Sequence, residues 1–148
     1  MQRLSYQQQA IAGMNGVELI VALYDGMVHF LNIAIAATKS GDVRARRIAV
    51  KRVLDILMHL QSRLRMDVGG PAKTLSEFYA SMFALCLEGS RLASVPRFRQ
   101  AIQCVLNVRE AWQQVAQDPE VRRQYAAPSA ARAEAALEAP RSASGWTA

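Results

Sequence analysis

The side chains in this sequence that could do chemistry are few, and they are scattered. The two histidines, His29 and His59, fall in separate apolar-patterned segments. Asp55 precedes His59 by about one turn of an α-helix, so its carboxylate could orient the imidazole. A catalytic site also needs a nucleophile and a pocket, and the sequence supplies neither beside this pair. The pattern therefore favours surface or half-buried histidines over an active site.

The cysteines and acidic residues give no metal-binding pattern. Cys86 and Cys104 show neither close pairing nor metal-ligand spacing, and we expect both to be small buried apolar residues. Helical bundles that hold two metal ions place a carboxylate on each of two helices and Glu-x-x-His on the others, and this chain has no such motif. Phosphate-loop and zinc motifs are also missing. We predict a non-enzymatic protein without a cofactor or metal.

The net charge of +6 is unevenly distributed along the chain. Residues 42–66 carry seven Lys and Arg against two Asp, whereas the remainder is nearly balanced. Such a segment is typical of a solvated helix face, but it could also bind nucleic acid or an acidic protein. In that alternative, the protein is a basic helical adaptor that uses Arg44, Arg46, Arg47, Lys51 and Arg52. Few aromatic residues accompany these cations, so nucleic acid is the less favoured partner.

Apolar periodicity and turn residues predict four helices. The expected ranges are 18–40, 43–66, 72–93 and 97–117, with spacings of three and four between apolar residues in each. Gly41 provides a stop signal, Asp42 and Ser94 are expected N-caps, and Pro71 suits a first helical turn. Short connections force neighbouring helices to run antiparallel. The fold class is therefore all-α, an antiparallel up-down-up-down four-helix bundle.

The bundle accounts for residues 17–117 as one domain. Residues 1–16 are expected to be a flexible lead-in, and residues 118–148 an Ala- and Arg-rich, mostly disordered tail. The first residues lack the apolar core of a secretory signal, and charged or polar residues interrupt the longest apolar stretch. We therefore expect a soluble cytoplasmic protein that does not insert into membranes.

The segment 18–38 contains more apolar residues than one core stripe requires. Leu19, Leu23, Met27, Phe30 and Ala34 form one stripe, while Ile20, Tyr24, Leu31 and Ile35 form a second. The segment 72–93 likewise has a second apolar face. If these two faces adjoin, they form a groove for an amphipathic helix. Tail residues or a homodimer partner could cover it instead. The predicted lining is Ile20, Tyr24, Met27, Leu31, Tyr79, Phe83 and Leu87.

Four segments together resemble the FliS family of flagellar secretion chaperones. They are ELIVALYDGMVHFLNIA at 18–34, ILMHLQSRLRMDVGG at 56–70, TLSEFYASMFALCLEGS at 74–90 and VREAWQQV at 108–115. Tyr6, ahead of the bundle, also matches the family. The resemblance covers about residues 5–117. It departs from the family at Gly89 and Ser90, where Ala-Asn is usual.

The resemblance implies a cytosolic export chaperone. It would bind the carboxy-terminal segment of flagellin, prevent premature polymerisation, and deliver flagellin to the type III export gate protein FlhA. Tyr6 and Ile11 would then dock into the empty groove or face the export gate. The salt dependence of binding distinguishes this function from the adaptor alternative, because binding to phosphates weakens steeply with ionic strength and apolar binding does not.

Overall fold

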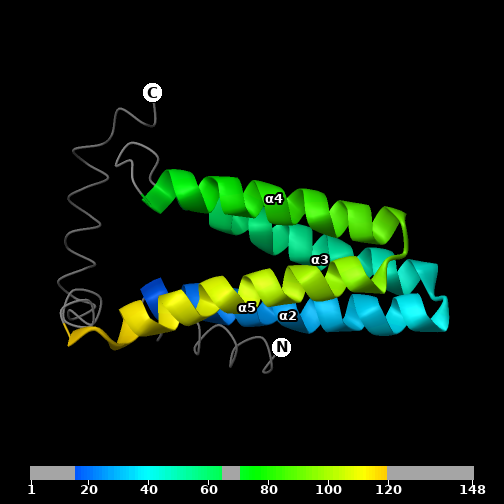
Figure 1. Cartoon of the computed structure of the whole chain (residues 1–148), viewed down its shortest axis with the longest axis horizontal. Coiled ribbons are helices and arrows are strands. Elements are labelled where there is room, and N and C mark those ends of the chain that lie inside the picture. Colours follow the sequence, from blue (N-terminus) through cyan, green and yellow to red (C-terminus); the bar gives the residue numbers. More distant parts are fainter. Residues whose placement is uncertain (1–15, 65–70, 120–148) are drawn as a thin grey trace, which may run out of the picture.

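The computed structural model describes residues 16–64 and 71–119. Within these ranges the chain forms four helices and no strand. They are α2 (Gly16–Ser40), α3 (Val43–Ser62), α4 (Pro71–Arg91) and α5 (Val95–Gln117). Successive helices run in opposite directions (Figure 1), which confirms the predicted all-α up-down-up-down bundle. Nearly all of the predicted lead-in and tail lies outside the described residues.

The four helices form a square arrangement. The helix α2 packs mainly against α3 and α5, and α4 packs against the same two helices. Figure 1 shows that the α2–α3 and α4–α5 connections lie together at one end, which we call the closed end. The first turn of α2 and the last turn of α5 lie at the opposite end, which we call the open end.

Two short connections finish the helices at the closed end. The side chain of Asp42 accepts a hydrogen bond from the backbone N–H of Ala45 at 3.0 Å, and Ser94 accepts one from Arg97 at 3.3 Å. These are N-caps, as the sequence predicted. Gly41 has a φ of +76°, the left-handed conformation that ends a helix at little cost for glycine. These local signals fix where α2 ends and where α3 and α5 begin.

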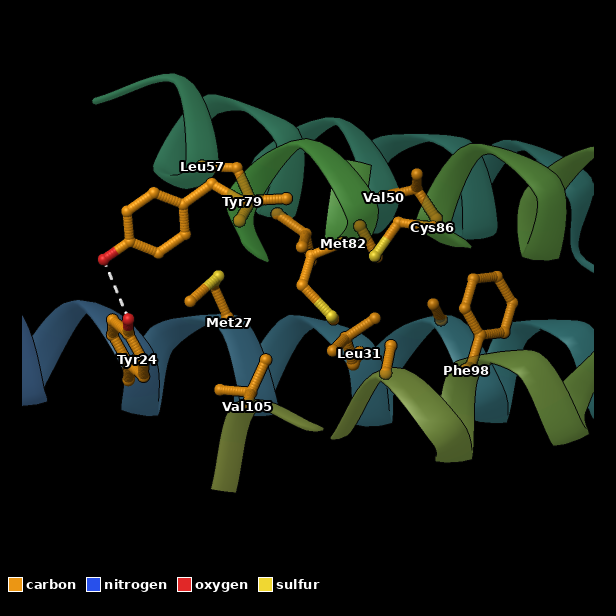
Figure 2. Close-up of a cluster of buried hydrophobic side chains, with 14 of the residues drawn as sticks. Tyr24, Met27, Leu31, Val50, Leu57, Tyr79, Met82, Cys86, Phe98 and Val105 are labelled. Atoms are coloured by element: carbon orange, nitrogen blue, oxygen red, sulfur yellow. Dashed lines mark hydrogen bonds between the residues drawn. The ribbon is translucent and has the colours of Figure 1, made fainter. Parts of the chain in front are cut away.

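The core is a single apolar cluster to which all four helices contribute (Figure 2). Its largest fully buried side chains include Tyr24, Met27 and Leu31 of α2, Leu57 of α3 and Phe98 of α5. On α4 the buried residues are Tyr79, Met82, Cys86 and Gly89. A Cβ atom at Gly89 would lie 2.9 Å from the Phe98 ring, so glycine lets α4 approach α5 closely. The apolar stripe predicted for α3 consists of Val50, Val53, Leu57, Leu60 and Leu64. The first four are buried as expected, whereas Leu64 follows the end of the helix and is only partly buried.

The predicted orientation of α2 is wrong. The sequence placed Tyr24 and Leu31 on an outward groove face, but both have no exposed surface. The predicted core residues Leu19, Leu23 and Phe30 are only partly buried. In a square bundle each helix contacts two neighbours, so the buried arc is wider than one stripe. The buried arc of α2 is centred between the two predicted apolar stripes.

The helix α2 is long and apolar enough to cross a membrane, judged by length and composition alone. In the bundle, however, its central residues Tyr24, Met27 and Leu31 are fully enclosed by the other helices. A helix that packs against two neighbouring helices in a bundle core has these properties.

Candidate partner-binding grooves

The structure brings the chemically capable side chains into no catalytic arrangement among the described residues. His29 and His59 are exposed, and Asp55 pairs with Lys51 at 3.0 Å. Burial raises the pKa of the Cys86 thiol to about 12, so it stays protonated near neutral pH and is a poor nucleophile. Within residues 16–64 and 71–119, no three His, Cys, Asp or Glu side chains lie close enough to hold a metal ion. The remaining candidates for function are apolar depressions.

The first depression, the α3–α4 groove, lies between the outer faces of these helices and has a volume of about 490 Å³. Leu57 and Met58 of α3 and Ala80 and Phe83 of α4 line it. Met58 is 60 % exposed, which is unusual for a long apolar side chain. Gln61 and Ser62 supply a polar edge. The groove therefore offers apolar surface with a polar rim.

A second depression, the α4–α5 groove, lies on the other side of α4 and has a volume of about 670 Å³. Leu75 on α4 faces Val108, Trp112 and Val115 on α5 across it. These spacings of three and four present one apolar stripe of α5 along the groove. Both sides of α4 are therefore flanked by apolar depressions.

A third depression, the end pocket, has a volume of about 470 Å³ and lies at the open end. It combines Leu19, Ile20 and Leu23 of α2 with Leu60 of α3 and Leu64, which follows α3, and it also reaches Tyr79 and Trp112. All three depressions lie in the half of the bundle nearer the open end. The closed half has none of these three.

Three side chains from three helices form a hydrogen-bonded cluster between the depressions. The hydroxyls of Tyr24 and Tyr79 lie 2.8 Å apart (Figure 2), and the indole N–H of Trp112 donates to the Tyr24 hydroxyl at 3.2 Å. Burial raises the pKa of both tyrosines, so both remain neutral at physiological pH. Because Tyr79 and Trp112 also line the depressions, these bonds fix the shape of the walls.

The structure separates the predicted groove residues into three groups. Tyr24, Met27 and Leu31 are buried core residues and have no surface that a partner could contact in this conformation. Ile20 and Phe83 line the depressions, and Tyr79 contributes to the edge of the lining. Leu87 is exposed and lies one turn beyond Phe83 on α4. Tyr6 and Ile11 lie outside the described residues.

Several lining residues were missed by sequence reasoning. Leu75, Val108, Trp112 and Val115 recur at the helical spacing of a core stripe, although they lie at the edge of the core and line the α4–α5 groove. Met58 lies one residue from the buried Leu57, yet it is mostly exposed. The sequence signal for these residues was an excess of apolar residues on α4 and α5. The prediction instead placed the surplus apolar faces on α2 and α4.

A family model described as flagellar protein FliS matches residues 1–119. This chain belongs to the FliS family. The match includes all four helices, so it confirms the family resemblance and agrees with the bundle fold. Among curated proteins, none matches the chain. Membership in FliS implies a role as a flagellar export chaperone, and residues 120–148 lie beyond the match.

Proposed function

We propose that this protein is a cytoplasmic chaperone that binds the carboxy-terminal segment of flagellin along α4. It keeps this segment from polymerising and delivers it to the type III export gate through FlhA. Membership in the FliS family supports the chaperone role. The observation that carries the proposed site is the pair of apolar grooves that flank α4 on both sides.

The chemistry of these grooves suits an amphipathic helix. Phe83 and Met58 line one groove and Trp112 and Val115 line the other, so a partner helix could bury an apolar stripe in either. Large aromatic side chains in such grooves supply most of the binding free energy in typical interfaces. A flagellin terminus that is unfolded before export would lose entropy on binding, and burial of its apolar stripe would offset that loss.

The test compares two substitutions on α5 that differ in position but hardly in exposure. Val115 and Leu106 are both 40 % exposed, but Val115 lines the α4–α5 groove and Leu106 is not among its lining residues. We expect Val115→Asp to weaken binding of a flagellin carboxy-terminal peptide by about tenfold or more, since it places a charge against the apolar stripe. Leu106→Asp should leave the affinity unchanged. Isothermal titration calorimetry measures both.

A second substitution tests the α3–α4 groove independently. Met58→Asp changes a side chain that is largely exposed, so the fold should tolerate it, and circular dichroism verifies this. Reduced peptide binding by this variant would assign the α3–α4 groove to flagellin as well. Equal affinities for Val115→Asp, Met58→Asp, Leu106→Asp and the unchanged protein would contradict both groove assignments. The buried Tyr24 is unsuitable for this test, because a charge there would unfold the bundle.

A further inference from the structure

Charge is divided between the two ends of the bundle. The half nearer the closed end, residues 29–52 and 81–106, carries nine Lys and Arg against two acidic residues, a net charge of +7. The other described residues, 16–28, 53–64, 71–80 and 107–119, carry three against six, a net charge of −3. The three apolar depressions lie in the second half. Arg46 is buried, and the other eight cations of the closed half are at least partly exposed, so the surface of the closed end carries an excess of positive charge.

The densest part of this surface is the outward face of α3. Ile48 is 50 % exposed, and its neighbours at helical spacings of three and four are Arg44, Lys51 and Arg52. Arg47 lies beside them and all four cations are exposed. Asp55, the nearest acid on this face, pairs with Lys51. An exposed aliphatic side chain thus lies among several guanidinium and ammonium groups.

The combination of exposed aliphatic side chains and cations continues at other residues of the closed end. Val43 begins α3 and Leu92 follows α4, and both aliphatic side chains are exposed at the connections. The two acids in this half are already engaged, since the Asp42 side chain caps α3 and Glu88 pairs with Arg91. The closed end therefore presents cations and aliphatic groups together.

We propose that the closed end is a peripheral docking surface for an anionic phospholipid bilayer. Cationic side chains attract anionic headgroups, and aliphatic side chains among them enter the headgroup region. Nucleic acid would use the cations but would gain little from Ile48, Val43 or Leu92. An acidic peptide with apolar residues would need a groove, and the grooves described above lie in the other half.

This docking leaves the α4 grooves accessible. The closed end would face the bilayer, while the residues that line the two grooves, apart from Phe83, belong to the other half of the bundle. The helices stay intact and no segment inserts. The protein would thus carry an apolar partner while resting on a membrane surface.

The experiment uses the full chain and vesicle flotation. We expect binding to phosphatidylcholine vesicles that contain about a third phosphatidylglycerol, and no binding to pure phosphatidylcholine vesicles. Arg44→Gln/Arg47→Gln should reduce binding by about 25-fold, because each cation near an anionic surface contributes about fivefold. The matched control, Arg63→Gln/Lys73→Gln, removes the same charge from the opposite half and should change binding less than about twofold. Ile48→Ser should reduce the binding that persists at high salt.

Three outcomes would overturn the proposal. Equal losses from both double variants would show an effect of net charge rather than of a surface. Equal binding to neutral vesicles would show that anionic headgroups are not recognised. Tighter, Arg44- and Arg47-dependent binding to a nucleic acid duplex than to anionic vesicles would assign this surface to phosphates of nucleic acid.

Discussion

The closed and open ends of this bundle are built differently. At the closed end, capped connections hold the helices, and the Phe98 ring packs closely on Gly89. At the open end the core finishes in the hydrogen-bonded cluster of Tyr24, Tyr79 and Trp112, and apolar depressions surround it. The three apolar depressions gather toward the open end, whereas the aliphatic side chains exposed at the closed end, such as Val43, Ile48 and Leu92, line none of them.

The difference shows how one short bundle can be stable and still bind a partner. Stability grows with apolar burial, and the closed half contributes buried side chains such as Phe98 and Cys86 to the core. Binding of an apolar segment needs surface that the fold leaves unburied, and the open half retains it at the cost of some stability. The polar cluster compensates in part, since its directional bonds hold α2, α4 and α5 in register where packing alone is looser.

Truncation of Phe98 is expected to have the largest effect on stability. Phe98 is fully buried at the closed end, and Phe98→Ala should lower the free energy of unfolding by about 3–5 kcal/mol through lost burial and the cavity left behind. Urea denaturation followed by circular dichroism measures this. The control, Leu106→Ala, changes a partly exposed residue on the same helix and should lower it by less than about 1 kcal/mol. Similar values for the two variants would show that burial does not set how much a side chain of α5 contributes to stability.

Much of the closed end was predictable from the sequence because its signals are local. Gly41, Asp42 and Ser94 act on the backbone within a few residues, and the α3 stripe has a clear polar opposite face. The rotation of α2 was not predictable in this way, since two apolar stripes satisfy the same helical period. Which arc is buried depends on the positions of α3 and α5. The contact of Gly89 with Phe98 likewise exists only once α4 and α5 meet.

The tyrosine cluster gives the second prediction. The Tyr24 hydroxyl bonds both Tyr79 and Trp112, whereas the Tyr79 hydroxyl bonds only Tyr24 among the described residues. Tyr24→Phe removes the hydrogen-bond partner of both the Tyr79 hydroxyl and the Trp112 indole N–H, and it should lower the free energy of unfolding by about 1–3 kcal/mol. Tyr79→Phe should lower it by about 1 kcal/mol. Urea denaturation of both variants tests this order. A larger loss for Tyr79→Phe would mean that the Trp112 bond contributes nothing at the open end.

The open end was harder to foresee for a related reason. Tyr24 lies 55 residues from Tyr79 and 88 from Trp112 in the sequence, so no spacing rule connects their hydroxyl and indole groups. The depressions depend on the separation between helices, which apolar periodicity does not encode. The sequence did indicate an excess of apolar residues and, through its motifs, the family. Only the packing distinguishes Phe83, which lines a groove, from Tyr24, which fills the core.

Alkaline pH probes the closed half through Cys86. Burial raises the pKa of this thiol from 9.0 to about 12, so the unfolded chain loses its proton first as pH rises. The free energy of unfolding should be unaffected below about pH 9 and then fall by about 1.4 kcal/mol per pH unit up to about pH 12. The raised pKa values of Tyr24 and Tyr79 add a further decrease above about pH 10.

Two alanine variants separate these contributions. Between pH 8 and pH 10, Cys86→Ala should lose about 1.4 kcal/mol less of its free energy of unfolding than the unchanged protein. Cys104→Ala keeps the buried Cys86 thiol and should show the full pH dependence. Urea midpoints at several pH values supply the comparison. An unaltered slope in Cys86→Ala would indicate that solvent reaches the core of the closed half.

The smallest expected effect concerns the ion pair that ties α5 to α2 toward the open end. Arg109 donates to both carboxylate oxygens of Asp25, while Lys51 pairs with Asp55 within α3. The Asp25 and Asp55 side chains are 53 % and 51 % exposed, but Arg109 is only 24 % exposed and Lys51 is 75 % exposed, so solvent screens the Arg109–Asp25 pair less. Asp25→Asn should lower the free energy of unfolding by about 0.5–1 kcal/mol, because a forked arginine pair is geometrically fixed. Asp55→Asn should lower it by about 0.3 kcal/mol. If both losses are equal in urea denaturation and vanish together in high salt, the α2–α5 pair adds nothing beyond a surface contact, and the open end depends on the tyrosine cluster alone.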